Sequence, residues 1–335
     1  MPIQQLVIGR ESLRLAGGPV EPVVSAETLL RAVSKESVES LRPLLPVGYT
    51  SVVEAYRGAA ADLTAQDLTS HYTEGMSFFH ETFVPYVKGL LQALSGGKWD
   101  LKDYVAYASG SDVDMMTHLV EGIASREKIC LFPGDWMGFE AGCTYPENIR
   151  WSKDSAGATA CLCIPSVRNG HFTEPMREFL QSAESCLLNL NLFPTLCPQE
   201  RSEVAGNLKG ILEKSVLSIS FSRGFGLTAS QLGLILVHRD HPWVSRFDRQ
   251  WKWFTYFYNA LAARAFMRVD IQQLGEVDNQ RREWVRAWLL ERGLPVVESG
   301  SYYVKSFQVE GAIPQELRPL SRDNIVRFCF KPPQT

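Results

Sequence analysis

Short apolar runs alternate with helical patterns through the middle of the chain, and this alternation most constrains the fold. The strand-like runs are residues 129–132, 159–164, 185–190, 216–221 and 233–237. The helical patterns between them are residues 115–123, 176–182 and 203–212. Strands joined by helical crossovers are typical of a mainly parallel sheet with helices on both faces. The sequence therefore predicts an α/β three-layer sandwich in this region.

The segments on either side of this region have a different pattern. A helical pattern precedes it at 75–95, and a segment dense in aromatic residues follows at 243–267. We interpret the aromatic segment as one or two helices packed in a core or a subunit interface. A base-stacking platform is the weaker interpretation, because few basic residues lie between the aromatic ones.

The C-terminal part of the chain predicts a second, smaller unit. A charged amphipathic helix over 276–291 is followed by Gly293, which suits a C-terminal cap. Three strand-like pieces follow, at residues 295–297, 302–307 and 324–330. A chain of 335 residues corresponds to roughly two domains. We expect a large α/β domain at 50–240 and a smaller α+β domain made of 1–49 together with 241–335.

The overall charge excludes some classes of partner. The chain has 34 basic and 37 acidic residues, a formal net charge of −3, and 45% hydrophobic residues that can form a large core. This balance argues against a polybasic nucleic-acid binder. No stretch reaches about 18 apolar residues, and the first residues lack a charged-then-apolar leader. We therefore expect no nucleic-acid partner, no membrane association and a cytoplasmic location.

The cysteines indicate a reducing compartment. There are seven, an odd number without the spacing of a small disulfide scaffold, so we interpret them as reduced thiols. Cys161 and Cys163 would face one side of a strand, and we favour buried packing over a redox or metal pair. His238 and His241 fit a strand-end loop as well as they fit a metal. We assign no metal site.

Residues 220–233 form the most specific passage in the chain. Its Ser220, Ser222, Gly226, Leu227 and Gly233 match in register the signature of class I/II aminotransferases, S-x-S-K-x-x-G-L-x-G-x-R-x-G. The chain thus resembles the fold type I pyridoxal-phosphate enzymes. The resemblance implies the large α/β domain of that fold with a smaller domain, and a homodimer.

Other landmarks of the resembled family occur in the right order, over roughly residues 45–330. Tyr72 to Gly75, followed by a helix, resembles the family's Y-x-x-x-G segment. Ser109-Gly110-Ser111 resembles the turn that holds the cofactor phosphate, and 290–304 resembles the late L-x-x-x-G stretch. The segment 324–330 resembles the last strand, whose arginine, here Arg327, binds the substrate carboxylate in the family.

The position that matches the family lysine holds Arg223. That lysine is needed because a neutral amine must attack the cofactor aldehyde and then move a proton. A guanidinium stays protonated at accessible pH, so Arg223 cannot form the Schiff base. Lys209 and Lys214, in or just after the preceding helix, would have to replace the lysine from elsewhere.

Other positions that contact the cofactor in the resembled family also differ. The phosphate-binding arginine is replaced by Gln231, and the aspartate that pairs with the pyridine nitrogen is replaced by Asn189. Leu192 stands where the family has the tyrosine that contacts the cofactor, and the asparagine of N-P-x-N-P-T-G falls at about Val167. Asp112 follows the phosphate-holding turn directly and would place a negative charge beside a phosphate. Each lost ionic contact costs about 1–3 kcal/mol. We do not expect tight, conventional binding of pyridoxal phosphate or a covalent lysine imine.

The remaining pocket residues suit a small carboxylate or phosphate ligand. We assign Arg223 as the catalytic candidate that orients or stabilises an anion. The substrate-binding candidates are Arg327, Tyr72, Trp136, Asn189 and Gln231. For a phosphate-bearing ligand, the binding candidates are Ser109, Gly110, Ser111 and Ser220. Simpler roles stay open: a salt bridge for Arg327, pairing of Arg223 with Asp112, ordinary packing for Trp136, and a turn at 109–111.

Three functions are compatible with the sequence. The first is a repurposed biosynthetic enzyme of specialised metabolism that acts, without Schiff-base chemistry, on an amino-acid-derived or carboxylate-bearing metabolite. The second is a non-catalytic partner subunit, with residues 243–258 supplying a dimer surface. The third is an enzyme that uses pyridoxal phosphate non-covalently or through another lysine.

Overall fold

The computed structural model describes most of the chain. The described residues are 7–8, 21–33, 35, 50–66, 72–110, 112–227, 230–250, 259–322 and 324–330. Ser111 and residues 251–258 of the aromatic segment lie outside them. Tyr72 is described as a backbone position only, and so is Asp112.

A seven-stranded sheet, here called the large sheet, is formed by the central residues that the structure describes. Its strands lie in the order β3 (Tyr104–Ser109), β9 (Gly233–His238), β8 (Ser215–Ser220), β7 (Ser185–Asn189), β6 (Thr159–Cys163), β4 (Ile129–Leu131) and β5 (Ile149–Trp151). The pairs from β8 through β5 are parallel, whereas β9 runs antiparallel to both β8 and β3. The predicted α/β fold with a mainly parallel sheet is confirmed, and the reversed β9 is a feature that the alternation did not predict.

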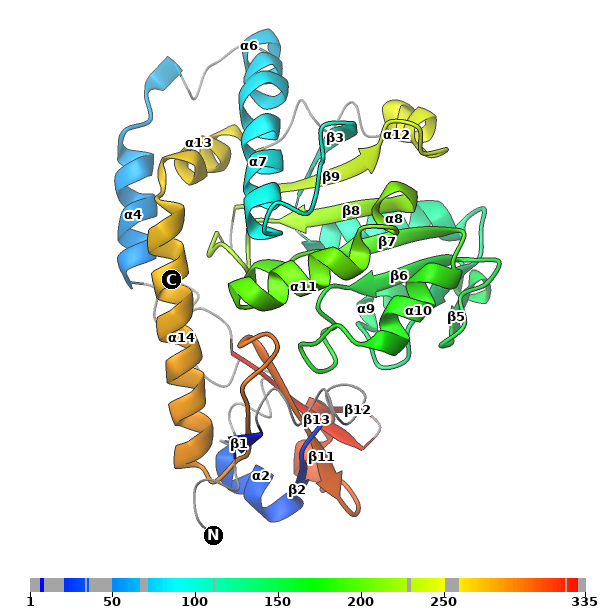
Figure 1. Ribbon diagram of the computed structural model, residues 1–335, viewed down its shortest axis with the longest axis vertical. Helices are drawn as coiled ribbons and strands as arrows, with labels where there is room; N and C mark the ends of the chain where they lie inside the picture. Colours follow the sequence, from blue (N-terminus) through cyan, green and yellow to red (C-terminus); the bar gives the residue numbers. More distant parts are fainter. Residues whose placement is uncertain are drawn as a thin grey trace.

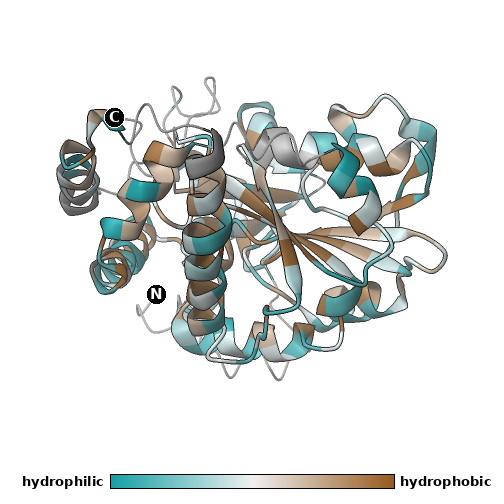
Figure 2. Ribbon diagram, turned by 90° about the horizontal axis from the view of Figure 1, so that it is seen from above, coloured by the Kyte–Doolittle hydropathy of each residue, from teal (hydrophilic) through white to brown (hydrophobic). Residues whose placement is uncertain are grey.

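Helices cover both faces of the large sheet, which makes three layers (Figure 1). One face carries α7 (Val84–Leu94), α10 (Glu174–Ser182) and α11 (Pro198–Leu208). The other carries α8 (Asp112–Ala124), α9 (Gly138–Ala141) and α12 (Val244–Gln250). Figure 2 shows the apolar strands between these helices, whose outer surfaces are more hydrophilic.

Alternation along the strands divides the apolar core into two parts. Leu162 packs in the core under α7, α10 and α11, whereas Cys161 and Cys163 pack in the core under α8. Successive side chains of a strand point to opposite faces, so each strand supplies both layers. This confirms the prediction that the two cysteines share one face, and all seven cysteines are free.

Segments from both ends of the chain form a second, four-stranded sheet, here called the small sheet. Its order is β12 (Ser321–Arg322), β13 (Ile325–Cys329), β11 (Val304–Glu310) and β2 (Val23–Ser25). A short pair, β1 (Val7–Ile8) with β10 (Val296–Val297), lies beside it. The long helix α14 (Ile271–Glu291) runs from the region of the large sheet to the small sheet (Figure 1). There its Trp288 packs 6.1 Å from Phe328, ring centre to ring centre.

The remaining helices of the described chain are short or lie outside the two sheets. They are α2 (Ala26–Ala32), α4 (Thr50–Ala61), α6 (Tyr72–Ser77), the π-helical turn η2 (Phe78–Phe83), α13 (Ala260–Arg268), and the 3-10 turns η3 (Pro146–Asn148), η4 (Phe193–Thr195), η5 (Leu212–Lys214) and η7 (Gln315–Leu320). None of the helices among the described residues is both long enough and apolar enough to span a membrane.

Some predicted boundaries were wrong. The helix expected at 203–212 begins at Pro198 and ends at Leu208. Its start is fixed by a capping box in which the Glu200 carboxylate accepts a hydrogen bond from Cys197 N, an interaction that precedes the apolar pattern. The strand expected from Tyr302 begins only at Val304, because the two tyrosines lie in a turn.

Candidate functional site

Most of the predicted site residues meet at one edge of the large sheet. Strands β3, β4, β6, β7 and β8 point the same way, so their carboxyl ends lie together, and the reversed β9 begins there at Gly233. In open α/β sheets the carboxyl ends of the strands are where ligands bind. This places Ser109, Asn189 and Ser220, each the last residue of its strand, along this edge.

A chain of two asparagines joins the ends of β7 and β8. The Asn189 Oδ1 accepts a hydrogen bond from Asn191 N at 3.0 Å, and the Asn191 Oδ1 accepts one from Ser220 N at 2.5 Å. The Ser220 hydroxyl lies 2.8 Å from the Ser222 hydroxyl. Asn191 is 2% exposed, and its Nδ2 has no hydrogen-bond partner among the described residues. Asn191 was not among the predicted site residues, although it is an amide within an apolar run, two positions after Asn189.

The turn after β3 brings an anion-binding arrangement to the same edge. Ser109 is buried, and its Oγ has no hydrogen-bond partner within the described part of the chain. The 13-residue helix α8 begins three residues later, and the backbone N–H groups of a helix start attract anions. Gly233 permits this close approach, because a Cβ there would lie 2.5 Å from Gly110 O.

Arg223 lies three residues beyond β8 in a glycine-containing turn. It is half-buried, and its guanidinium carbon lies 5.6 Å from the centre of the Tyr303 ring. Tyr303 is 2% exposed and belongs to the loop before β11. A Cβ on Gly224 would lie 2.7 Å from Pro194 Cγ, so the turn packs tightly against η4. Gln231, by contrast, is exposed and has a φ of 48°.

Arg327 connects the small sheet to the loop after β6. Its Nη1 donates a hydrogen bond to Val167 O at 2.9 Å. Beside it on β11, opposite Arg327 in the register, the Ser306 hydroxyl donates to Arg168 O.

Asp135 organises the loops after β4 and β6. Its carboxylate accepts hydrogen bonds from Cys163 N at 2.8 Å, Val167 N at 3.3 Å and the Ser166 hydroxyl at 3.2 Å. Burial raises the pKa of Asp135 to about 6, although these donors favour the charged form. Asp135 thereby fixes the backbone whose Val167 carbonyl receives Arg327. The sequence analysis did not identify this carboxylate.

Trp136 packs within the fold. Its ring lies edge-on to Phe139 at 5.0 Å, and a Cβ on Gly138 would clash with it at 2.3 Å. Tyr72 is the first residue of α6. Of the predicted site residues, Ser109, Asn189, Ser220 and Arg223 lie at or just beyond the carboxyl ends of their strands, and Arg327 contacts the loop after β6.

The two lysines considered as substitutes lie at the opposite edge of the large sheet. Lys209 follows α11 and Lys214 precedes β8, so both are at the amino end of that strand. The Lys214 Nζ donates to Gln181 O at 2.9 Å and to Ala183 O at 2.6 Å. A six-residue strand spans about 20 Å, which separates these amines from the carboxyl edge. Within the described residues, no group of three His, Cys, Asp or Glu side chains could hold a metal.

Comparison with known proteins identifies this architecture. No protein-family model matches the chain, and no curated protein matches it. Among solved structures, an aminotransferase from Staphylococcus aureus is 12% identical with a TM-score of 0.59, over 86% of each chain. L,L-Diaminopimelate aminotransferase from Chlamydomonas reinhardtii is 11% identical with a TM-score of 0.59, over 89% of this chain and 84% of that chain.

A lyase has the same fold. The pyridoxal-phosphate-bound C-S lyase from Staphylococcus hominis is 12% identical with a TM-score of 0.52, over 79% of this chain and 73% of that chain. At these identities the similarity concerns the fold. The chain therefore has the fold type I architecture of pyridoxal-phosphate enzymes, which include aminotransferases and lyases.

Proposed function

We propose that this chain is an aminotransferase-like protein that has lost conventional pyridoxal-phosphate chemistry. Its site would bind an amino-acid-derived or carboxylate-bearing small molecule and act on it without a lysine imine. The observation that carries the proposal is the position of Arg223, three residues after β8 at the carboxyl edge of the large sheet, where the resembled family has its lysine.

The residues at this edge do not fit covalent attachment of pyridoxal phosphate. Attachment requires a neutral amine, and the guanidinium of Arg223 stays charged at all accessible pH values. Lys209 and Lys214 lie about 20 Å away along β8, with the Lys214 Nζ bound to two main-chain carbonyls. Neither lysine can serve without refolding of the strand.

The neutral residues support the same conclusion. Asn189 ends β7 with its Oδ1 already accepting from Asn191 N, so it offers no carboxylate to a protonated ring nitrogen. Gln231 is exposed and uncharged, so it offers no ionic contact to a phosphate. Two missing ionic contacts would weaken binding by about 1–3 kcal/mol each.

The site nevertheless retains donors for a small anion. The Ser109 hydroxyl is unpaired among the described residues and adjoins the start of α8. Arg327 uses one N–H for Val167 O, and a guanidinium has five donors, so it can also bind a carboxylate. Arg223 beside the Tyr303 ring would stabilise charge that develops on the ligand.

A restoration experiment tests this proposal. The wild-type chain mixed with pyridoxal phosphate should give no borohydride-stable adduct at the carboxyl edge. The triple variant Arg223→Lys, Asn189→Asp and Gln231→Arg should gain such an adduct on residue 223, detected by peptide mass spectrometry. An adduct on any lysine of the wild-type chain that supports transamination would contradict the proposal.

A second measurement identifies the ligand. Native mass spectrometry of the purified chain should detect a small carboxylate that is retained by wild type and lost at least about tenfold more readily from Arg223→Ala. The exposed Arg318→Ala serves as the matched control. Equal retention by wild type and Arg223→Ala would remove Arg223 from the proposed site and would favour a non-catalytic partner role.

A further inference from the structure

The four residues that precede β11, here called the 300–303 turn, bind segments that belong to the large sheet. Gly300 N donates a hydrogen bond to the Glu200 carboxylate of α11 at 2.7 Å. Ser301 N donates to Gly170 O, in the loop after β6, at 2.8 Å. The turn is therefore fixed against two segments that lie apart in the sequence.

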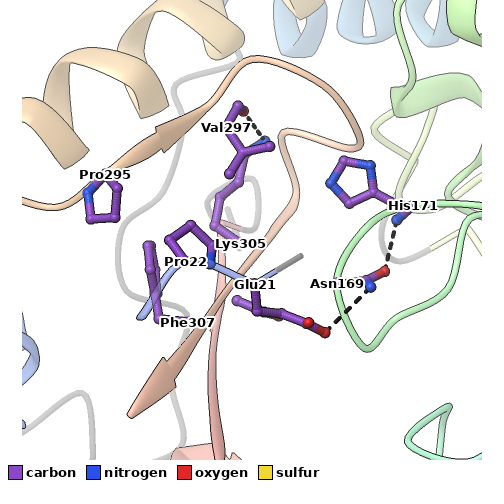
Figure 3. A pocket seen from close by; sticks show the side chains of 9 residues that line it. Glu21, Pro22, Asn169, His171, Pro295, Val297, Lys305 and Phe307 are labelled. Carbon is purple, nitrogen blue, oxygen red and sulfur yellow. Dashed lines mark hydrogen bonds between the residues drawn. The ribbon is translucent and has the colours of Figure 1, made fainter. Parts of the chain in front are cut away.

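Lys305 and His171 hold the chain at the beginning of this turn. The Lys305 Nζ donates to Val297 O and to Ser299 O, each at 3.2 Å. Gly300 has a φ of 83°, and a Cβ on it would lie 2.5 Å from His171 Cε1. Figure 3 shows His171 and Lys305 beside a cavity of about 20 Å³, which has room for one water-sized group. The chain that leads into the turn is thus closely packed.

A chain of hydrogen bonds runs from the 300–303 turn to the loop after β7. Tyr303 N donates to Ser301 Oγ at 3.1 Å. The Ser301 Oγ lies 2.5 Å from Thr195 Oγ1, and the Thr195 hydroxyl donates to Leu192 O at 2.5 Å. Because a hydroxyl carries one proton, Ser301 supplies the proton between the two side chains, and all donors point the same way. Hydrogen bonds arranged in this way strengthen one another, and both hydroxyl residues are fully buried.

The two ends of this hydrogen-bond chain contact the turn that carries Arg223. At one end, the centre of the Tyr303 ring lies 5.6 Å from the Arg223 guanidinium carbon, within the range of a cation–π contact. At the other end, Pro194 precedes Thr195 and packs on Gly224, where a Cβ would lie 2.7 Å from Pro194 Cγ. The contacts and the hydrogen bonds therefore close into a ring that includes Arg223.

We propose that Thr195, Ser301 and Tyr303 are positioning residues that hold the Arg223 guanidinium in one orientation at the carboxyl edge of the large sheet. The inference rests on the function proposed above, in which Arg223 meets the anionic group of the ligand. The hydroxyl chain fixes the Tyr303 ring relative to the loop after β7, and the turn that carries Arg223 contacts both. A guanidinium that is already oriented loses less conformational freedom on binding, so it binds a planar carboxylate more tightly.

The first experiment measures how fast phenylglyoxal modifies Arg223 in the full chain, followed by peptide mass spectrometry. Thr195→Val removes the hydroxyl at similar shape and should raise the rate about fivefold, the effect of one hydrogen bond. Tyr303→Leu removes the ring from one face of the guanidinium and should raise the rate at least as much. Thr195→Ser and Tyr303→Phe keep the hydroxyl and the ring, so each should restore the wild-type rate.

The matched control removes a different buried hydroxyl. Ser215 is fully buried at the amino end of β8, and its hydroxyl donates to Ile211 O at 2.7 Å. Ser215→Ala should leave the modification rate of Arg223 unchanged. If the substitutions at the ring raised the rates of Arg322 and Arg327 as much as that of Arg223, the junction would have opened as a whole, and the proposal would be wrong. A rate at Arg223 that none of them changes would also overturn it.

Protection by acetate separates this inference from the function on which it rests. Acetate should slow the modification of Arg223 in the wild-type chain, and Thr195→Val should need about fivefold more acetate for the same protection. The same acetate requirement in both chains would show that the hydroxyl chain has a structural role only. If acetate gave the wild-type chain no protection while Thr195→Val still raised the rate, the proposed function would be contradicted and the positioning of Arg223 supported.

Discussion

Asp135 shows how a single buried carboxylate organises the region around the site. It is fully buried and accepts three hydrogen bonds, one from the last residue of β6 and two from the loop that follows. Burial nevertheless dominates and raises its pKa to about 6. Ionisation of this carboxyl is therefore harder in the folded chain than in the unfolded one.

The pKa of Asp135 predicts a pH dependence of stability. Between about pH 4 and pH 6 the unfolded chain has released this proton while the folded chain retains it, so stability falls as pH rises. A shift of about two units corresponds to ~3 kcal/mol. Because the unfolded carboxyl is already partly ionised at pH 4, the free energy of unfolding of wild type minus that of Asp135→Asn should decrease by ~2 kcal/mol from pH 4 to pH 7, measured by urea denaturation.

Wild type and Asp135→Asn share all other titratable groups. Subtracting their free energies of unfolding therefore removes the pH dependence that those groups cause. Asp154→Asn, at an exposed position, is the matched control and should show no such change between pH 4 and pH 7. A difference that stays constant over this range would show that the Asp135 carboxyl is ionised in the folded chain at pH 4.

The sequence alone was enough to select some of the candidate site residues. The hydroxyl and guanidinium residues of the 220–223 and 324–330 segments could be selected because their motifs are local in sequence. Asp135 and Asn191 could not, because their roles depend on hydrogen bonds to backbone from other strands. The Arg223–Tyr303 contact joins residues far apart in the chain and has no local signal.

At the scale of elements, β9 is constrained where it begins. Gly233 starts the strand between β3 and β8, where a Cβ would lie 2.5 Å from Gly110 O and 3.0 Å from Ile219 O. These are backbone atoms of β8 and of the turn after β3, which cannot move aside as a flexible side chain can. The antiparallel strand β9 can therefore lie between β3 and β8 because its first residue is a glycine.

Gly233→Ala should destabilise the chain by about 2–3 kcal/mol, because the methyl group forces the neighbouring strands apart. Thermal or urea unfolding measures the change, and hydrogen exchange should increase at β3 and β9. Gly89→Ala is the control, because it lies in α7 with nothing within 4 Å of the added Cβ. That variant should be neutral or more stable by up to about 1 kcal/mol. Equal effects of the two substitutions would contradict the steric argument.

Local patterns predicted most of the elements around the site. Strands β4, β6, β7, β8 and β9 and helix α8 occur where the periodicity placed them. The errors arose where a cap or a turn overrides periodicity, as at Cys197–Glu200 and at Tyr302. The short strands β2 and β5 have too few residues for a periodic signal.

At the scale of the molecule, hydrogen bonds to main-chain carbonyls join the small sheet to the large one. Arg322 donates to Asp135 O, Arg327 to Val167 O, and Ser301 N to Gly170 O at 2.8 Å. Carboxylates also act across this junction, because Glu21 pairs with Arg168 at 3.2 Å and Glu200 accepts a hydrogen bond from Gly300 N at 2.7 Å.

Arg322→Ala should weaken this junction by about 1–2 kcal/mol. Hydrogen exchange should rise in β11 and β13, while β8 in the large sheet stays protected. Arg318→Ala, an exposed neighbour, is the matched control and should leave both sheets unchanged. A uniform loss of protection in both sheets would show that they unfold as one unit and would contradict the proposed local weakening.

The sequence by itself determined the α/β class, the order of the central elements and the residue types at the candidate site. These follow from local information: the period of the apolar residues, and motifs carried by contiguous segments. Tertiary structure decided that β9 is reversed, that Lys209 and Lys214 lie at the edge away from Arg223, and that Lys305 and His171 face one cavity. Strand direction and burial depend on contacts between distant segments, and a local pattern carries no information about those contacts.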